Sequence, residues 1–160
     1  YNNLMTEVRK CIELLFDSMA RNGVLPNQKR NDGTYALLDI LTDKRGSRNL
    51  TWCSMLLSGK SVTVGEKKIT SDKILPNVLK DSFQRLVEIA ASYEHAENTD
   101  ATKEQKANSR QTQSFLASIG YAPYLLRGMV MEICTIILWY SNYLEEHDDE
   151  ELNRLKWEIL

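Results

Sequence analysis

The sequence is poor in the side chains that most often carry out catalysis or bind metals: its 160 residues include two histidines and three cysteines. The motifs of zinc proteases, thiol redox proteins, serine hydrolases and dinucleotide-binding proteins are all absent. The segment SGKS at 58–61 resembles the end of a phosphate-binding loop, but the leading glycine of that loop is missing. We therefore expect a protein that is not an enzyme, with no cofactor and no metal site.

We expect no catalytic or calcium-binding role for the two histidines and the densest acidic run. His95 follows Tyr-Glu at a predicted helix end, and His147 lies within the acidic run at 145–151. That run lacks the alternation and the glycine of a calcium-binding loop. We expect solvated histidines and a helix cap in these places.

Cysteines and long apolar runs are also scarce. Cys11, Cys53 and Cys134 lie far apart, and their odd number favours free thiols in a reducing compartment over a disulfide framework. The most apolar run, 129–140, is about a dozen residues long and contains Glu132, whereas a membrane span needs about 20. No basic and then apolar signal segment opens the sequence. These features predict a cytoplasmic protein with no membrane partner.

Apolar residues recur at helical spacing along most of the chain, which predicts a mainly α fold. In the segment 4–19 they repeat every three or four residues, and Asn22-Gly23 then supplies a helix stop. We expect a single domain, 1–160, of six to eight helices. Further helices are expected over 34–42, 49–57, 77–93, 113–119, 124–146 and 150–160. The helix over 124–146 is apolar almost all round and is expected at the centre, and 98–112 is expected to be a polar surface crossing.

One small β-hairpin, at about 61–70, interrupts the helical pattern. Val62 and Val64 alternate with polar residues, and Gly65-Glu66 suits a two-residue turn with a positive φ at the glycine. An isolated hairpin is only marginally stable in water. We therefore expect this hairpin to lie against helices or to pair with another segment.

Charge is distributed unevenly along the chain. The region 23–90 holds eleven Lys and Arg against seven Asp and Glu, whereas 111–160 holds three against eight. A basic first half and an acidic second half suit an anionic partner at one end, or head-to-tail association of opposite patches.

Nine cations in two loops and around the hairpin form a candidate contact surface for phosphates. They are Lys29, Arg30, Lys44, Arg45, Arg48, Lys60, Lys67, Lys68 and Lys73. Tyr35 and Trp52 are near enough in sequence to offer stacking surfaces for bases. The alternative is that these are ordinary solvated side chains, or lysines that prevent unwanted pairing of a strand edge.

Apolar residues also stand at the end of the sequence, beyond an acidic helix. Trp157, Ile159 and Leu160 form a terminal apolar patch. Such a patch is a candidate for docking onto a neighbouring subunit, so these three residues are the predicted assembly contacts.

The middle of the chain, 50–97, resembles the core of capsid proteins from flexible filamentous plant RNA viruses. It is also similar in layout to nucleoproteins of segmented negative-strand viruses. The resemblance rests on the Trp52 helix, the hairpin, and a following helix with an aspartate, an aromatic, an arginine and a leucine, here Asp81, Phe83, Arg85 and Leu86. It implies a cooperative RNA coat whose terminal arms link neighbouring subunits, and it adds Arg85 to the expected RNA contacts.

The leading hypothesis is a non-enzymatic RNA-binding assembly subunit, a homo-oligomer on single-stranded RNA in the cytoplasm or in a virion. One alternative is a helical small subunit of a larger ribonucleoprotein, such as a CRISPR effector complex. Another is a protein-interaction helical domain without nucleic acid. A hydrolase ranks last, because the chain offers so few titratable groups.

Overall fold

The computed structural model describes residues 2–42, 49–72, 75–97, 102–118, 122–148 and 157–160. These ranges contain five α-helices, one short 3₁₀ helix and five short strands. In chain order they are α1 (Asn2–Arg21), β1 (Asn27–Lys29), β2 (Tyr35–Leu37), η1 (Asp39–Leu41), α2 (Leu50–Leu57), β3 (Val62–Val64), β4 (Lys67–Ser71), α3 (Asn77–Glu97), α4 (Lys103–Ser118), α5 (Ala122–Glu146) and β5 (Trp157–Ile159).

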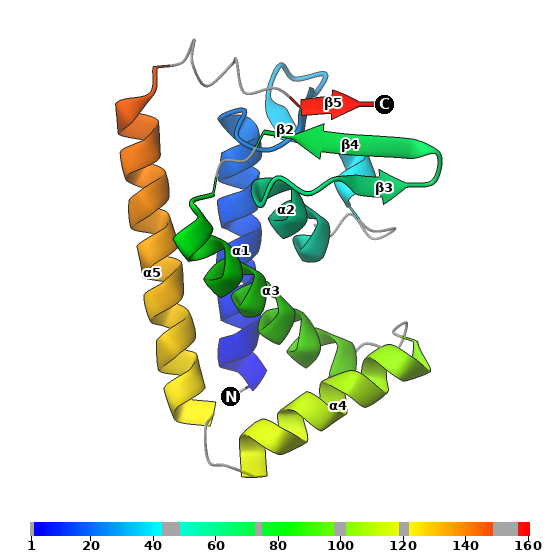
Figure 1. Cartoon of the computed structure of the whole chain (residues 1–160), viewed down its shortest axis with the longest axis vertical. Helices are drawn as coiled ribbons and strands as arrows, with labels where there is room; N and C mark the ends of the chain where they lie inside the picture. Colours follow the sequence, from blue (N-terminus) through cyan, green and yellow to red (C-terminus); the bar gives the residue numbers. More distant parts are fainter. Residues whose placement is uncertain (1, 43–48, 73–74, 98–101, 119–121, 149–156) are drawn as a thin grey trace.

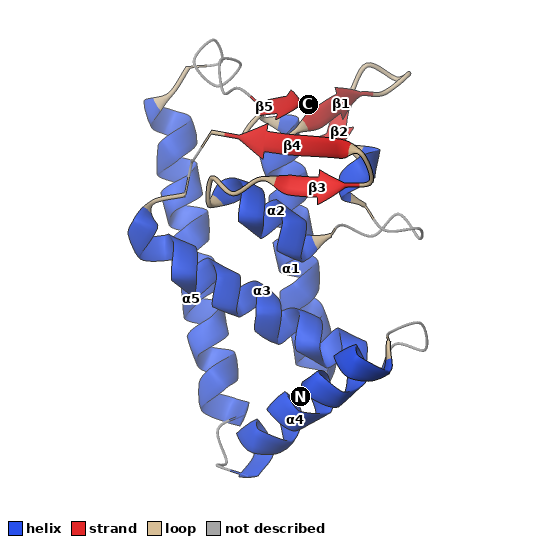
Figure 2. Ribbon diagram, turned by 45° about the vertical axis from the view of Figure 1, so that its right-hand side comes forward, coloured by secondary structure: helices blue, strands red, loops and turns tan. Residues whose placement is uncertain are grey.

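The strands gather at one end of the molecule. Helices α1 and α5 run in the same direction, and α3 begins beside α5 and crosses in front of α1 (Figure 1). Both small sheets lie where α1 and α5 end, while α4 crosses the opposite end (Figures 1 and 2). One sheet pairs β1 with β2, and the other has the order β3-β4-β5.

Helix α1 forms as its apolar spacing predicts. Val8, Ile12 and Phe16 fall on one buried face, so the helix is held by packing as well as by its own hydrogen bonds. It ends where Gly23 takes a left-handed φ of 77° and the N–H of Val24 donates to the Met19 carbonyl at 2.8 Å. This glycine cap turns the chain toward the first sheet.

The core is centred on an aromatic contact between α1 and α3. The rings of Phe16 and Phe83 lie edge to face, with centroids 5.4 Å apart and planes at 83°. Both side chains are fully buried. Such a pair adds a directional contribution of about 0.5–1.5 kcal/mol to the burial of its area. The contact therefore fixes both the distance and the orientation of the two helices.

Helix α5 joins this core along one face and is tied to α1 by a hydrogen-bond network. Met129, Ile133 and Ile136 are buried on that face, together with Tyr140. The amide of Asn22 donates to the Tyr140 hydroxyl at 2.8 Å, and the Ser18 hydroxyl lies 3.3 Å from the same oxygen. The end of α1 is thereby bound to the last part of α5.

The predicted fold class was wrong: the fold is mixed α/β, with two small antiparallel sheets instead of one hairpin. The helix predicted over 34–42 is replaced by β2 and η1. In the preceding turn Gly33 has a φ of 84°, and Asp32 accepts hydrogen bonds from the Thr34 N–H and hydroxyl at 2.9 and 2.6 Å. This turn reverses the chain so that β2 pairs with β1.

The helix predicted over 150–160 was also wrong at its end, since residues 157–159 form β5. Residues 149–156 lie outside the described residues. β5 pairs with β4 in antiparallel register, with Ile159 opposite Ile69. Trp157 and Ile159 are two positions apart. This spacing fits one face of a strand and also occurs in a short helix, so it does not distinguish the two. The open edge of β4 decides between the two, because its backbone groups need partners.

The predicted hairpin at 61–70 is present as β3 and β4. Val62 pairs with Ile69, and both side chains are buried against the helices. Gly65 has a φ of 62°, as the predicted turn requires. The hairpin gains a third strand in β5, which agrees with the expectation that it pairs with another segment.

The segment predicted as a polar surface crossing, 98–112, runs into α4. That helix begins at Lys103 and contacts α3. Residues 98–101 lie outside the described residues.

We expect Phe83→Ala to lower the free energy of unfolding by about 3–5 kcal/mol, because it leaves a cavity against Phe16 in the core. Urea unfolding measures the change. As a control, Gln84→Ala removes the next side chain of α3, whose amide bonds to Glu88 of the same helix, and should cost below about 1 kcal/mol. A loss of less than about 1 kcal/mol for Phe83→Ala would show that the contact does not organise the core.

We expect deletion of residues 157–160 to lower the free energy of unfolding by about 1–3 kcal/mol, because β4 loses its partner and Trp157 its packing. Glu158→Thr, a change at an outward-facing position of the strand, should leave stability nearly unchanged. Urea unfolding of both variants tests this, and equal stability of the deletion and the parent chain contradicts it.

Candidate functional site

Five of the predicted phosphate contacts lie at the sheet end of the molecule. They are Lys29, Arg30, Lys60, Lys67 and Lys68, and all five are exposed. Within the described part of the chain, none of the five is held in an ion pair. The two sheets lie next to each other in both views (Figures 1 and 2). The other predicted loop cations, Lys44, Arg45, Arg48 and Lys73, lie outside the described residues.

Carboxylates share this end of the molecule. Asp32 lies in the β1–β2 turn, where hydrogen bonds from the Thr34 hydroxyl and N–H, and then the charge of Arg30, lower the pKa of its carboxyl. Glu66 lies in the β3–β4 turn and Asp72 directly after β4. Glu158 pairs with Thr70 and is a diagonal neighbour of Lys68 on the same face of the sheet.

The described sheet end therefore places the carboxylates of Asp32, Glu66, Asp72 and Glu158 beside the five predicted cations. The sequence did not predict that Glu158 is a diagonal neighbour of Lys68, because the two residues are far apart in the chain and β5 was expected to be helical. A mixed surface of this kind attracts a polyanion less strongly than the basic rim expected from the sequence.

Arg85, the contact added by the viral resemblance, forms an ion pair with Glu132 between α3 and α5. The arginine side chain is largely exposed and the glutamate is about three-quarters covered, with 26% of its side chain accessible. The pair joins two helices that also meet through apolar residues. The charge of Arg85 is therefore already balanced within the chain.

The two predicted stacking residues differ in exposure. Tyr35 is exposed on β2 and lies opposite Lys29 of β1. Trp52 is partly buried and packs against the core. Only Tyr35 of this pair is thus open to a base.

The predicted assembly residues belong to β5 or follow it directly. Trp157 is half-buried against the core, and Ile159 and Leu160 are exposed. Lys68 and Leu160 exchange two backbone hydrogen bonds, at 3.1 and 2.8 Å. This segment is therefore paired within its own chain, and a contact with another subunit through Ile159 and Leu160 stays a prediction.

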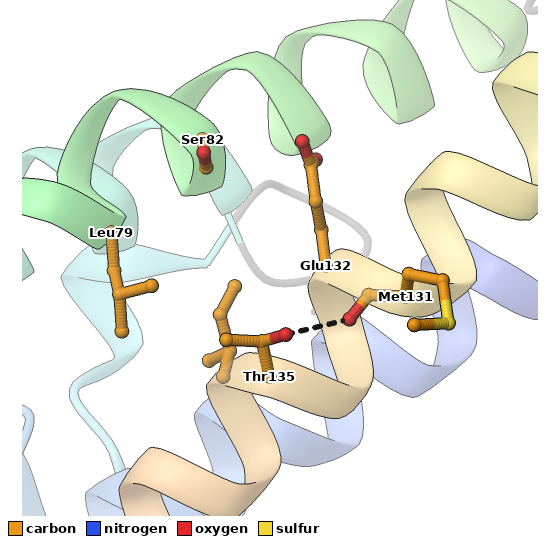
Figure 3. Close-up of a pocket in the computed structure, with 6 residues that line it drawn as sticks. Leu79, Ser82, Met131, Glu132 and Thr135 are labelled. Carbon is orange, nitrogen blue, oxygen red and sulfur yellow. Dashed lines mark hydrogen bonds between the residues drawn. The ribbon is translucent and has the colours of Figure 1, made fainter.

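A small open pocket of about 190 Å³ lies between α3 and α5. Figure 3 shows its walls, with Leu79 and Ser82 on α3 and Met131, Glu132 and Thr135 on α5. The Thr135 hydroxyl donates to the Met131 carbonyl at 3.0 Å, and Glu132 is bound by Arg85. Sites for small molecules are usually larger, about 300–1,000 Å³, with polar groups free to bind. This pocket offers little to a substrate.

The exposed face of α5 is the most unusual surface in the described part of the chain. Large apolar side chains stand on it along several turns of the helix, with 68% of Met131 and 66% of Leu138 exposed. The others are Tyr124, Val130 and Ile137. Cys134 is exposed among them.

The expectation that this helix is central was wrong, because only one of its faces enters the core. The sequence did contain the signal: a helix that is apolar all round is either fully buried or leaves a face for a partner. Periodicity within one helix does not say how many neighbours surround it.

In the described ranges, titratable groups do not converge into a metal site. Among the described residues, no group of three or more histidine, cysteine or acidic side chains is placed to hold a metal ion. His147 stacks on Tyr143, with ring centroids 4.1 Å apart, and its Nδ1 lies 2.8 Å from the Tyr143 carbonyl. This histidine therefore closes the end of α5.

The described helices include none with the length and hydropathy to cross a bilayer. The resemblance of 50–97 to viral capsid proteins and nucleoproteins stays a prediction. Comparison of the chain with protein-family models, with curated proteins and with solved structures finds no match.

Proposed function

We propose that this chain is a non-enzymatic protein-interaction domain that takes part in an assembly through the exposed apolar face of α5. The observation that carries the proposal is the set of five large apolar side chains exposed on this one helix. Single exposed apolar residues are common on protein surfaces, whereas a contiguous patch marks a contact with another molecule.

The face is large enough to matter energetically. Full burial of a side chain such as Met131 or Leu138 contributes about 1.5–3 kcal/mol. Association costs about 4–15 kcal/mol in lost freedom of motion. The five side chains are 43–68% exposed, so each contributes only part of this amount when a partner covers it. Their sum is comparable to the lower part of that cost.

The face is also held in place before binding. Tyr140 is bound to the end of α1, and Glu132 to Arg85 of α3. The helix between these two attachments therefore loses little further freedom when a partner docks, which favours affinity. Exposed free thiols at Cys11 and Cys134 fit action in a reducing compartment such as the cytosol.

We expect a photo-crosslinking amino acid at position 138, introduced in the cells that make the protein, to yield discrete cross-linked species, because a partner covers this face. The same amino acid at position 111, an exposed site on α4, serves as the matched control and should yield none. Denaturing gels and mass spectrometry provide the readout. The absence of discrete species from position 138 contradicts the proposal.

Contact with single-stranded RNA at the sheet end is a second candidate function. Lys29, Arg30, Lys67 and Lys68 favour it, since all are exposed and held in no ion pair within the described residues. Tyr35 adds an exposed ring opposite Lys29. A docked α5 face and an RNA-binding sheet end are compatible, because they involve different surfaces of the molecule.

We expect Lys67→Glu with Lys68→Glu to weaken binding to a fluorescent single-stranded RNA by about tenfold or more at low salt, because two phosphate contacts become repulsive. Lys103→Glu with Arg110→Glu makes the same charge change on exposed residues of α4 and should have a smaller effect. Fluorescence anisotropy at several salt concentrations measures both. Equal losses, or no binding by the parent chain, argue against this site.

A further inference from the structure

We propose that the partner of α5 is a second copy of this chain, with the two α5 helices packed antiparallel about a twofold axis. The proposal rests on the proposed function, since it identifies the partner of the same face. A second copy fits this face because the order of residues along α5 is complementary to itself when reversed.

The exposed residues of α5 are spaced as in a pair of packed helices. Six exposed positions of α5 alternate steps of four and three residues, which is the heptad pattern of helices that pack side by side. They are Arg127, Met131, Cys134, Leu138, Ser141 and Glu145. They extend over about 27 Å of helix at 1.5 Å per residue. Val130 and Ile137 are also exposed and widen the apolar stripe along one side.

The charges on this stripe have opposite signs at its two ends. The stripe carries its cation, Arg127, near the start of α5 and its carboxylate, Glu145, near the end, with Glu146 beside it. All three side chains are exposed. In an antiparallel pair, Arg127 meets Glu145 of the partner subunit at both ends of the contact. A parallel pair instead places arginine against arginine and glutamate against glutamate, which is unfavourable.

The antiparallel register also matches small side chains with large ones. When Arg127 is level with Glu145 of the partner subunit, the two helices cross at the level of Ile136. Cys134 then lies opposite Leu138 of the partner subunit, and Met131 opposite Ser141 of the partner subunit. A small side chain faces a large one in every inner layer, which allows close packing. The antiparallel helix dipoles also attract each other.

A self-complementary patch of this type forms a twofold dimer, the commonest assembly of identical chains. Each residue in one half of the stripe contacts a residue in the other half of the partner subunit's stripe. The same helix therefore supplies both sides of the interface. The two small sheets of each subunit lie level with the last turns of α5, to one side of the helix (Figure 1).

The first experiment is sedimentation equilibrium of the full chain over a range of concentrations. We expect a monomer–dimer equilibrium that Met131→Lys or Leu138→Lys shifts toward monomer by at least about a hundredfold in Kd, since each dimer receives two buried charges. Tyr35→Lys removes an exposed aromatic side chain on β2 with the same added charge and should leave the dimer intact. Circular dichroism confirms that each variant is folded.

The second experiment tests the charge pairs. We expect Arg127→Glu and Glu145→Arg each to weaken the dimer by about tenfold, because each change creates two like-charge contacts per dimer. The combined variant restores both attractions and should return Kd to near the parent value. Additive losses in the combined variant would overturn the proposed pairing.

The third experiment tests orientation by disulfide formation in a Cys11→Ser, Cys134→Ser background. Chains with Arg127→Cys and chains with Glu145→Cys should cross-link when mixed under oxidising conditions, while neither should cross-link alone. Cross-linking of each chain alone indicates a parallel pair and overturns the proposal.

A chain that is monomeric at all concentrations also overturns this proposal, but it leaves the protein-interaction function open. The crosslinking experiment at position 138 then separates the two cases. A cross-link to a different protein retains the proposed function with another partner. No cross-link at all rejects both.

Discussion

The edge-to-face contact between Phe16 and Phe83 is the interaction on which the rest of the structure depends. It holds α1 against α3, and the other elements are arranged around these two helices. α2 lies against α3 and supports the β3–β4 hairpin, while β2 packs against α1. The β1–β2 pair has too few strands to be stable alone, and the three-stranded sheet buries Val62 and Ile69 against the helices. Both sheets therefore depend on the aromatic contact that fixes the helices beneath them.

Helix α5 contributes only one of its apolar faces to the same core. Met129, Ile133 and Ile136 face inward, whereas Met131 and Leu138 face outward. The Tyr140 and Glu132 contacts fix the rotation of the helix about its own axis, and so decide which residues stay outside. A structural constraint on one side of the helix thus defines the exposed apolar surface on the other.

The sequence predicts well the elements whose signals are local. The buried stripe of α1, its end at Gly23 and the hairpin turn at Gly65 all follow from residues within one or two turns of chain. β5 was not predictable in this way, because its partner in β4 is separated from it by most of the chain. The candidate site shows the same division: the exposure of Lys67 and Lys68 follows from the hairpin, but the approach of Glu158 depends on a distant pairing. The open face of α5 depends on how many neighbours a helix has, which no local pattern encodes.

The place of β5 in its sheet has a consequence for how the chain matures during synthesis. β4 can pair with β3 as soon as both are synthesised. Its other edge stays unpaired until β5 is synthesised, about ninety residues later. Contacts of such high sequence separation form late and slowly. Until then the nascent domain presents an unsatisfied row of amide and carbonyl groups, which makes it vulnerable to mispairing with neighbouring chains. Completion of the fold is thus coupled to arrival of the segment that contains Trp157.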